Sequence, residues 1–210
     1  MMGLEIKTIV VGQLEVNCYI VYDPEKREAI VVDPGDEPDR ILDLITTDNL
    51  KVTHIVCTHT HFDHVGAIPE LRESTAAQIV IHKKEAEIYE AARDMAALWG
   101  YDVDPLPPPD IFVSEGDEIR TGNLVFRVIH TPGHSPGGIC LYGHGIVITG
   151  DTLFAGSVGR TDFPGGDMNL LKESFKRLMT LPEDTIVLPG HGPQSTIGRE
   201  KRENFFINEV

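Results

Sequence analysis

The chain has 210 residues, of which 33 are acidic and 18 are basic, so its formal net charge is −15. This acidity excludes nucleic acid as the expected partner, because phosphate binding needs a concentrated basic surface, and no apolar run approaches the roughly 18–20 residues of a membrane span. The start of the chain lacks a secretory signal pattern, and Cys18, Cys57 and Cys140 are odd in number and widely spaced, so we expect one cytoplasmic domain without disulfides.

Short runs rich in β-branched residues dominate the first part of the chain and predict strands at 5–11, 17–22, 28–32, 54–57 and 78–82. Helices are predicted where apolar residues recur every three or four positions. The first begins near Pro38, the second covers 66–73 and the third covers 84–99. The third helix places four apolar residues on one face: Ile88, Ala92, Met95 and Trp99.

A cluster of prolines between 105 and 109 predicts a loop in the middle of the chain. The strand pattern then resumes at 117–119, 123–130, 138–142, 145–149 and 184–189. A further helix is predicted at 169–179, and the stretch from Gly198 predicts a last helix anchored by Phe205 and Phe206. Runs of strands with interspersed helices predict a layered α/β domain.

Four of the predicted strands end in the same way, with a turn-forming residue followed by histidine or aspartate. The four endings are THTHFDH at 58–64, TPGH at 131–134, GD at 150–151 and GH at 190–191. Strand ends at one edge of a sheet can converge in space, and histidine and aspartate are typical ligands of divalent metals. The recurrence therefore predicts a metal site, and it disfavours the alternative that THTHFDH is a solvated turn.

The THTHFDH segment alone offers four ligands, more than a single three-ligand catalytic zinc requires. His59 and His61 project from the same side of an extended segment, whereas the next two candidates point differently and suit a second ion. The predicted sets are His59, His61 and His134 for one ion, Asp63, His64 and His191 for the other, and Asp151 between them. We expect ordinary structural or surface roles for the other histidines, His54, His82, His130 and His144. His130 directly precedes TPGH, so a role in supporting the ligands is its alternative.

In this order the motifs match the signature of the metallo-β-lactamase superfamily, H-x-H-x-D-H followed by a histidine, a bridging aspartate and a last histidine. Within it, VVDPG, GDTLFAGSVGRTDFPGGD and LPGHGPQSTIGRE resemble short bacterial glyoxalase-II-like (hydroxyacylglutathione hydrolase-like) hydrolases. The resemblance implies a four-layer αββα sandwich over residues 1–210, without the helical C-terminal domain of full-length glyoxalase II. It also implies that Asp33 supports the ligands, with a turn-forming role before Pro34 as the alternative.

The resemblance and the chemistry of the site imply a dinuclear metal-dependent hydrolase, in which a hydroxide that bridges the two ions attacks the substrate. Asp63 and Asp151 are the candidate catalytic carboxylates as well as ligands. The expected cofactors are two divalent ions, zinc foremost, although the same donors accept iron or manganese. With both ions bound the site is net positive, so an anionic substrate can approach it despite the acidic chain.

The expected substrate is a small-molecule thioester such as S-lactoylglutathione, or an ester. By resemblance, Arg160 lies near a substrate carboxylate, which it could bind bidentately; the alternative is that Asp162 holds this arginine. The rival functions are a mononuclear iron persulfide dioxygenase using His59, His134 and Asp151, a lactone or ester hydrolase, and a non-catalytic metal-binding scaffold. A true β-lactamase is disfavoured by Asp151, where the zinc-dependent branch generally places a cysteine.

Overall fold

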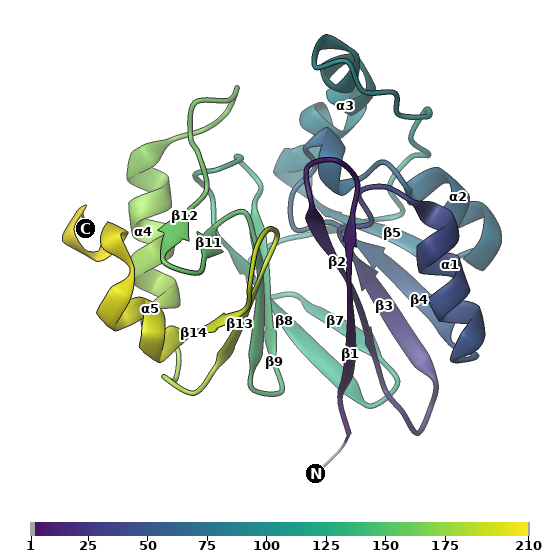
Figure 1. Cartoon of the computed structure of the whole chain (residues 1–210), viewed down its shortest axis with the longest axis horizontal. Helices are drawn as coiled ribbons and strands as arrows, with labels where there is room; N and C mark the ends of the chain where they lie inside the picture. Colours follow the sequence, from purple (N-terminus) through teal and green to yellow (C-terminus); the bar gives the residue numbers. More distant parts are fainter. Residues whose placement is uncertain (1–2, 210) are drawn as a thin grey trace.

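The computed structural model describes residues 3–209, in which two six-stranded sheets face each other and helices cover both outer sides (Figure 1). A short two-stranded ribbon lies beside the second sheet. This is the four-layer αββα sandwich that the family resemblance implied. None of the helices within residues 3–209 is long and apolar enough to cross a membrane.

The first sheet combines an antiparallel half and a parallel half. Its strands, in spatial order, are β1 (Glu5–Val11), β2 (Val16–Tyr22), β3 (Glu28–Val32), β4 (Lys51–Val56), β5 (Gln78–His82) and β6 (Ile111–Val113). The first three strands pair antiparallel, and β3 to β6 pair in parallel. The helices that follow its strands are α1 (Pro38–Thr47), α2 (Ile68–Thr75) and α3 (Ala86–Leu98), with 3-10 turns η1 (Phe62–His64) and η2 (Lys83–Glu85).

The second sheet is formed by the C-terminal half of the chain. Its strands are β7 (Glu118–Thr121), β8 (Leu124–His130), β9 (Ile139–Gly143), β10 (Ile146–Gly150), β13 (Ile186–Pro189) and β14 (Ser195–Thr196). The spatial order is β14-β13-β10-β9-β8-β7, in which only β10 and β13 are parallel. Helices α4 (Met168–Leu178) and α5 (Ile197–Glu203) cover it, the ribbon consists of β11 (Leu153–Phe154) and β12 (Ser157–Val158), and η3 (Phe205–Glu209) follows α5.

Alternation along the strands builds the layers, and β2 shows how. All seven of its residues are buried. Tyr19 and Val21 contribute to the core between the two sheets, whereas Cys18 and Ile20 contribute to the core under the helices of the first sheet. Successive side chains of a strand point to opposite faces, so a strand covered on both faces is largely apolar, and the amide of Asn17 in β2 is hydrogen-bonded.

Several predicted boundaries were wrong. The strand predicted at 54–57 begins at Lys51, and the helix predicted at 66–73 begins at Ile68, after the 3-10 turn η1. The helix predicted at 84–99 begins at Ala86, because η2 precedes it. At the C-terminal end Phe206 is buried but Phe205 is 60% exposed, so only one of the two predicted phenylalanines anchors it.

Candidate metal centre

The polar residues at the ends of β4, β8, β10 and β13 come together at one edge of the sandwich, as the sequence predicted. Five of them follow these strands closely: His59, His61, His134, Asp151 and His191. The parallel pair β10–β13 brings two of the strand ends side by side, and the Gly190 N–H donates to the Gly150 carbonyl over 2.8 Å. The topology therefore assembles residues that are far apart in the chain.

Hydrogen bonds between the two sheets fix this edge. The Tyr19 hydroxyl donates to the Pro189 carbonyl over 2.7 Å, and the Asn17 side-chain amide donates to the same oxygen over 2.9 Å. The Asn17 N–H also donates to the Gly190 carbonyl over 2.7 Å. Since Asn17 and Tyr19 belong to β2, the loop that carries His191 is held by the opposite sheet.

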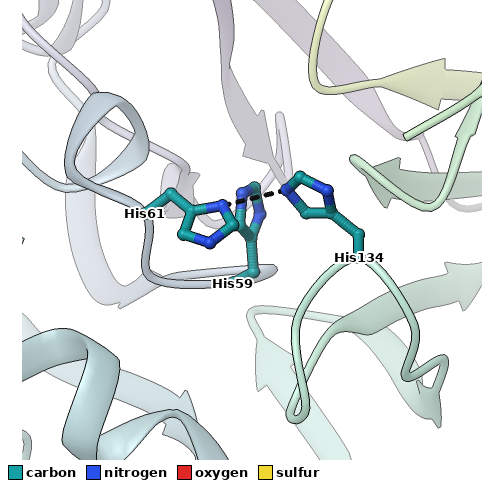
Figure 2. A group of neighbouring side chains, drawn as sticks. All are labelled: His59, His61 and His134. Carbon is teal, nitrogen blue, oxygen red and sulfur yellow. Dashed lines mark hydrogen bonds between the residues drawn. The ribbon is translucent and has the colours of Figure 1, made fainter. Parts of the chain in front are cut away.

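The first group of candidate ligands consists of His59, His61 and His134, whose ring nitrogens converge within 4.8 Å (Figure 2). His61 Nδ1 and His134 Nε2 lie 2.9 Å apart. His59 Nε2 is buried and has no hydrogen-bond partner among the described residues. A buried nitrogen without a partner costs free energy unless something binds it, so this group fits a cation.

The ring of His134 is oriented by a backbone carbonyl. Its Nδ1 lies 2.7 Å from the Arg160 carbonyl oxygen, to which it can only donate. A neutral imidazole that donates through Nδ1 keeps the lone pair of Nε2 free, and that atom faces His61 and Asp151.

The second group consists of Asp63, His64 and His191, with ligand atoms again within 4.8 Å of one another. His64 Nε2 lies 3.3 Å from His191 Nε2 and 3.7 Å from Asp63 Oδ2. The 3-10 turn η1 carries Asp63 and His64, and its curvature turns them away from the extended segment before it. This local structure separates the two groups along one short sequence.

Asp151 lies between the two groups. Its Oδ2 is 3.5 Å from His134 Nε2 in the first group and 3.6 Å from His191 Nε2 in the second. Its Oδ1 is 3.5 Å from His64 Nε2, and this buried oxygen has no hydrogen-bond partner among the described residues. One carboxylate therefore contacts both groups.

The electrostatics of the two groups differ. Burial, followed by the neighbouring His134, lowers the pKa of His61 to about 3, and burial lowers the pKa of His59 well below its ordinary value. Burial alone would also lower the pKa of His64, but Asp63 and Asp151 raise it to about 10. His59 and His61 are thus neutral at pH 7, the form in which an imidazole binds a metal ion, whereas the carboxylates of Asp63 and Asp151 favour a positive charge at His64.

Asp33 holds the segment before these ligands. One carboxylate oxygen accepts from the Thr58 N–H over 2.7 Å, and the other accepts from the Thr58 hydroxyl over 2.7 Å. Asp33 Oδ2 also lies 3.2 Å from His64 Nδ1. Asp33, His59 and His64 form a third convergent trio, but Thr58 already uses both Asp33 oxygens. The residue therefore anchors Thr58, next to His59, and lies within ion-pair distance of His64.

Glu85 is a site residue that the sequence analysis missed. Its side chain is fully buried at the end of η2. Oε2 accepts from the N–H and the hydroxyl of Thr60, both over 2.9 Å, and Oε1 accepts from the Gly137 N–H over 2.6 Å. One carboxylate thus joins the loop of His59 and His61 to the loop of His134.

His82 was predicted as an ordinary residue, and for His130 the sequence also left open a role in supporting the ligands. The two rings stack beside the loop of His134. Their rings lie 4.2 Å apart at an interplanar angle of 11°. His82 Nδ1 accepts from the Lys84 N–H over 3.2 Å, and His130 Nε2 lies 3.1 Å from the Pro136 carbonyl. Burial, and then His130, lower the pKa of His82 to about 4.

We expect His82 to make stability depend on pH. Between the ordinary histidine value near pH 6.5 and pH 4, the unfolded chain binds a proton that folded His82 does not. The free energy of unfolding therefore decreases as the pH falls through this window, by on the order of 1–2 kcal/mol from His82. Urea unfolding at several pH values should show a smaller decrease for His82→Gln than for the native chain, and replacing exposed His144 by Gln provides the control. An identical decrease in native protein and His82→Gln would contradict the assignment.

Arg160 is paired with Asp162, which is the alternative that the sequence left open. Its Nε and Nη2 donate to the two Asp162 carboxylate oxygens over 2.6 Å each, and its guanidinium lies 4.1 Å from the centre of the Phe163 ring. Arg160 does line the cavity beside the metal centre, which has a volume of about 510 Å³. A substrate carboxylate would have to replace Asp162 to bind this arginine.

Comparisons with known proteins cover nearly the whole chain. Residues 11–191 match the model of the metallo-β-lactamase superfamily. A hydroxyacylglutathione hydrolase, GloC, of Haemophilus influenzae is 37% identical, over 98% of this chain and 99% of the relative.

Solved structures share the fold at similar coverage. The B3 metallo-β-lactamase BLEG-1 superposes with a TM-score of 0.90 at 36% identity, over 97% of this chain and 99% of that chain. TTHA1623 in a di-iron-bound form superposes with a TM-score of 0.88 at 42% identity, over 95% and 99%. The match to the family model spans all four strand endings that carry the candidate ligands.

Proposed function

Because the chain belongs to the metallo-β-lactamase superfamily, we propose that it is a dinuclear metal-dependent hydrolase of thioesters, with S-lactoylglutathione as the first substrate to test. The observation that carries the proposal is the position of Asp151, whose carboxylate contacts both three-residue groups. The likeness to a hydroxyacylglutathione hydrolase supports the thioester, and the di-iron relative supports two ions rather than one.

The chain's own residues prepare the site for this reaction. One ion would be held by His59, His61 and His134, and the other by Asp63, His64 and His191. Asp151 would bind both ions. Two divalent ions bound there would supply hydroxide at neutral pH and a Lewis acid for the substrate carbonyl. Asp33, Glu85 and the Arg160 carbonyl hold the ligands in place before substrate arrives.

A thioester suits a site of this composition. Its leaving thiol has an ordinary pKa of about 8.5, so it can depart as thiolate without a general acid. Cleavage gives a carboxylate and a thiol. An alcohol or amine is a poorer leaving group and depends more on proton donation.

Elemental analysis and activity on one preparation test the proposal. We expect close to two metal ions per chain and hydrolysis of S-lactoylglutathione, measured as release of the thiol. Chelation should abolish this activity, and added metal should restore it. The matched assays are oxygen consumption on glutathione persulfide and hydrolysis of a lactone and a cephalosporin, the last because of the likeness to BLEG-1.

If the protein holds one iron per chain and consumes oxygen with the persulfide, it is a dioxygenase and the proposed hydrolase function is wrong. Faster cleavage of the lactone or the cephalosporin than of any thioester would move the activity to that substrate class. A fully metallated protein that turns over none of these compounds would support the scaffold alternative.

A further inference from the structure

We propose that the cavity beside the metal centre binds an apolar acyl group, so that the preferred thioesters carry acyl chains longer and more apolar than lactoyl. This inference rests on the proposed function. It comes from the wall that α3 and the loop after β12 form next to His61, a wall to which the metal chemistry assigns no role.

Helix α3 turns much of its apolar stripe toward this cavity. Ile88, Met95 and Trp99, which the sequence placed on one helix face, all line the cavity, together with Ala91. Trp99 remains 53% exposed, whereas Ala92, the fourth residue of the stripe, is buried in the core together with Tyr89 and Ala96. A large, partly exposed apolar face beside a reactive centre is typical of a substrate site.

Phe163 connects this wall to the metal centre. Its ring meets the Trp99 ring edge to face, with centroids 5.8 Å apart, and meets the His61 ring in the same way at 5.3 Å. The aromatic surface is therefore continuous from α3 to a candidate metal ligand. An apolar group attached directly to a carbonyl at the metal centre would lie along it.

Apart from the candidate metal ligands, the charged residues that line the cavity are exposed. Lys84 and Glu87 are exposed side chains of opposite charge, and Arg160 is already paired with Asp162. A charged carrier thiol can remain hydrated near these residues. The wall of Ile88, Met95 and Trp99 has no charged group that could bind a charge. The acyl part is thus the part of the thioester that this wall fits.

The test uses Trp99, the single tryptophan of the chain, as the reporter. S-methylglutathione and S-hexylglutathione are thioethers that cannot be hydrolysed, and each is titrated against the metallated protein while Trp99 fluorescence is recorded. We expect S-hexylglutathione to bind at least about tenfold more tightly, because each buried methylene contributes about threefold to fourfold.

Two variants of α3 form a matched pair. Ala91 and Ala97 are both exposed alanines of this helix, but only Ala91 lines the cavity. Ala91→Asp should weaken the binding of S-hexylglutathione about tenfold, and Ala97→Asp should leave it unchanged. Equal affinities for the two thioethers, or equal losses in the two variants, would overturn the proposal.

Kinetics separate this proposal from the proposed function. With acetylglutathione and hexanoylglutathione as substrates, kcat/KM should rise with chain length, and Ala91→Asp should remove the rise. Hydrolysis without length dependence would reject the acyl site and keep the hydrolase. Length-dependent thioether binding without any thioester hydrolysis would keep the site and reject the hydrolase.

Discussion

Replacing Asp151 by alanine is expected to lower thioester hydrolysis by more than about a hundredfold and to leave fewer than two metal ions per chain. Removing a residue that only supports a ligand typically costs 10–100-fold in metal affinity or activity, and Asp151 contacts both ligand groups directly. Its two oxygens lie 3.5–3.6 Å from nitrogens of His64, His134 and His191. Asp33 also lies near His59 and His64, but Thr58 uses both of its oxygens.

Elemental analysis and thioester kinetics on the same preparation measure both effects of Asp151→Ala. Asp94→Ala is the matched control, because Asp94 is an exposed aspartate of α3 that does not line the cavity. It should retain two ions per chain and native kcat. If Asp151→Ala keeps full activity, the proposed dinuclear mechanism is wrong.

The convergence of the candidate ligands could be predicted because each ligand-bearing loop directly follows a strand that the sequence pattern itself identifies. Each of the four loops follows a β-branched run long enough to identify as a strand, and chain topology then brings strand ends to one edge. The alternation of His59 and His61, and the change of direction at Asp63, were also readable from spacing. The very short strands β6, β11, β12 and β14 were not predicted, since two or three residues show no period.

The direction that α3 faces could not be predicted from its sequence. Periodicity identifies an apolar stripe, but it does not say whether the stripe meets a core or a cavity, and here Met95 and Trp99 line the cavity. Glu85 was missed for a related reason. In the sequence HKKEAE it looks like one charge of a solvated helix, and its burial depends on partners 25 and 52 residues away.

Glu85 gives the second large expected effect. Glu85→Ala would leave the buried N–H groups of Thr60 and Gly137 without acceptors, and each such group costs about 1–3 kcal/mol. We therefore expect the free energy of unfolding to fall by about 2–5 kcal/mol. Glu85→Gln retains the side-chain volume and one acceptor oxygen, so it should fold and reveal the effect on the metal centre alone.

In Glu85→Gln the loops of His61 and His134 lose part of their common anchor, and their ring nitrogens, 2.9 Å apart in the native chain, should become less well placed. Competition with a chromophoric chelator should show a metal affinity 10–100-fold lower for one of the two ions, on the order found for residues that orient ligands. Glu90→Gln, which alters an exposed glutamate of α3, should retain the native affinity. Because the chelator measures binding without turnover, native affinity for both ions in Glu85→Gln would show that the carboxylate stabilises the fold without positioning the ligands.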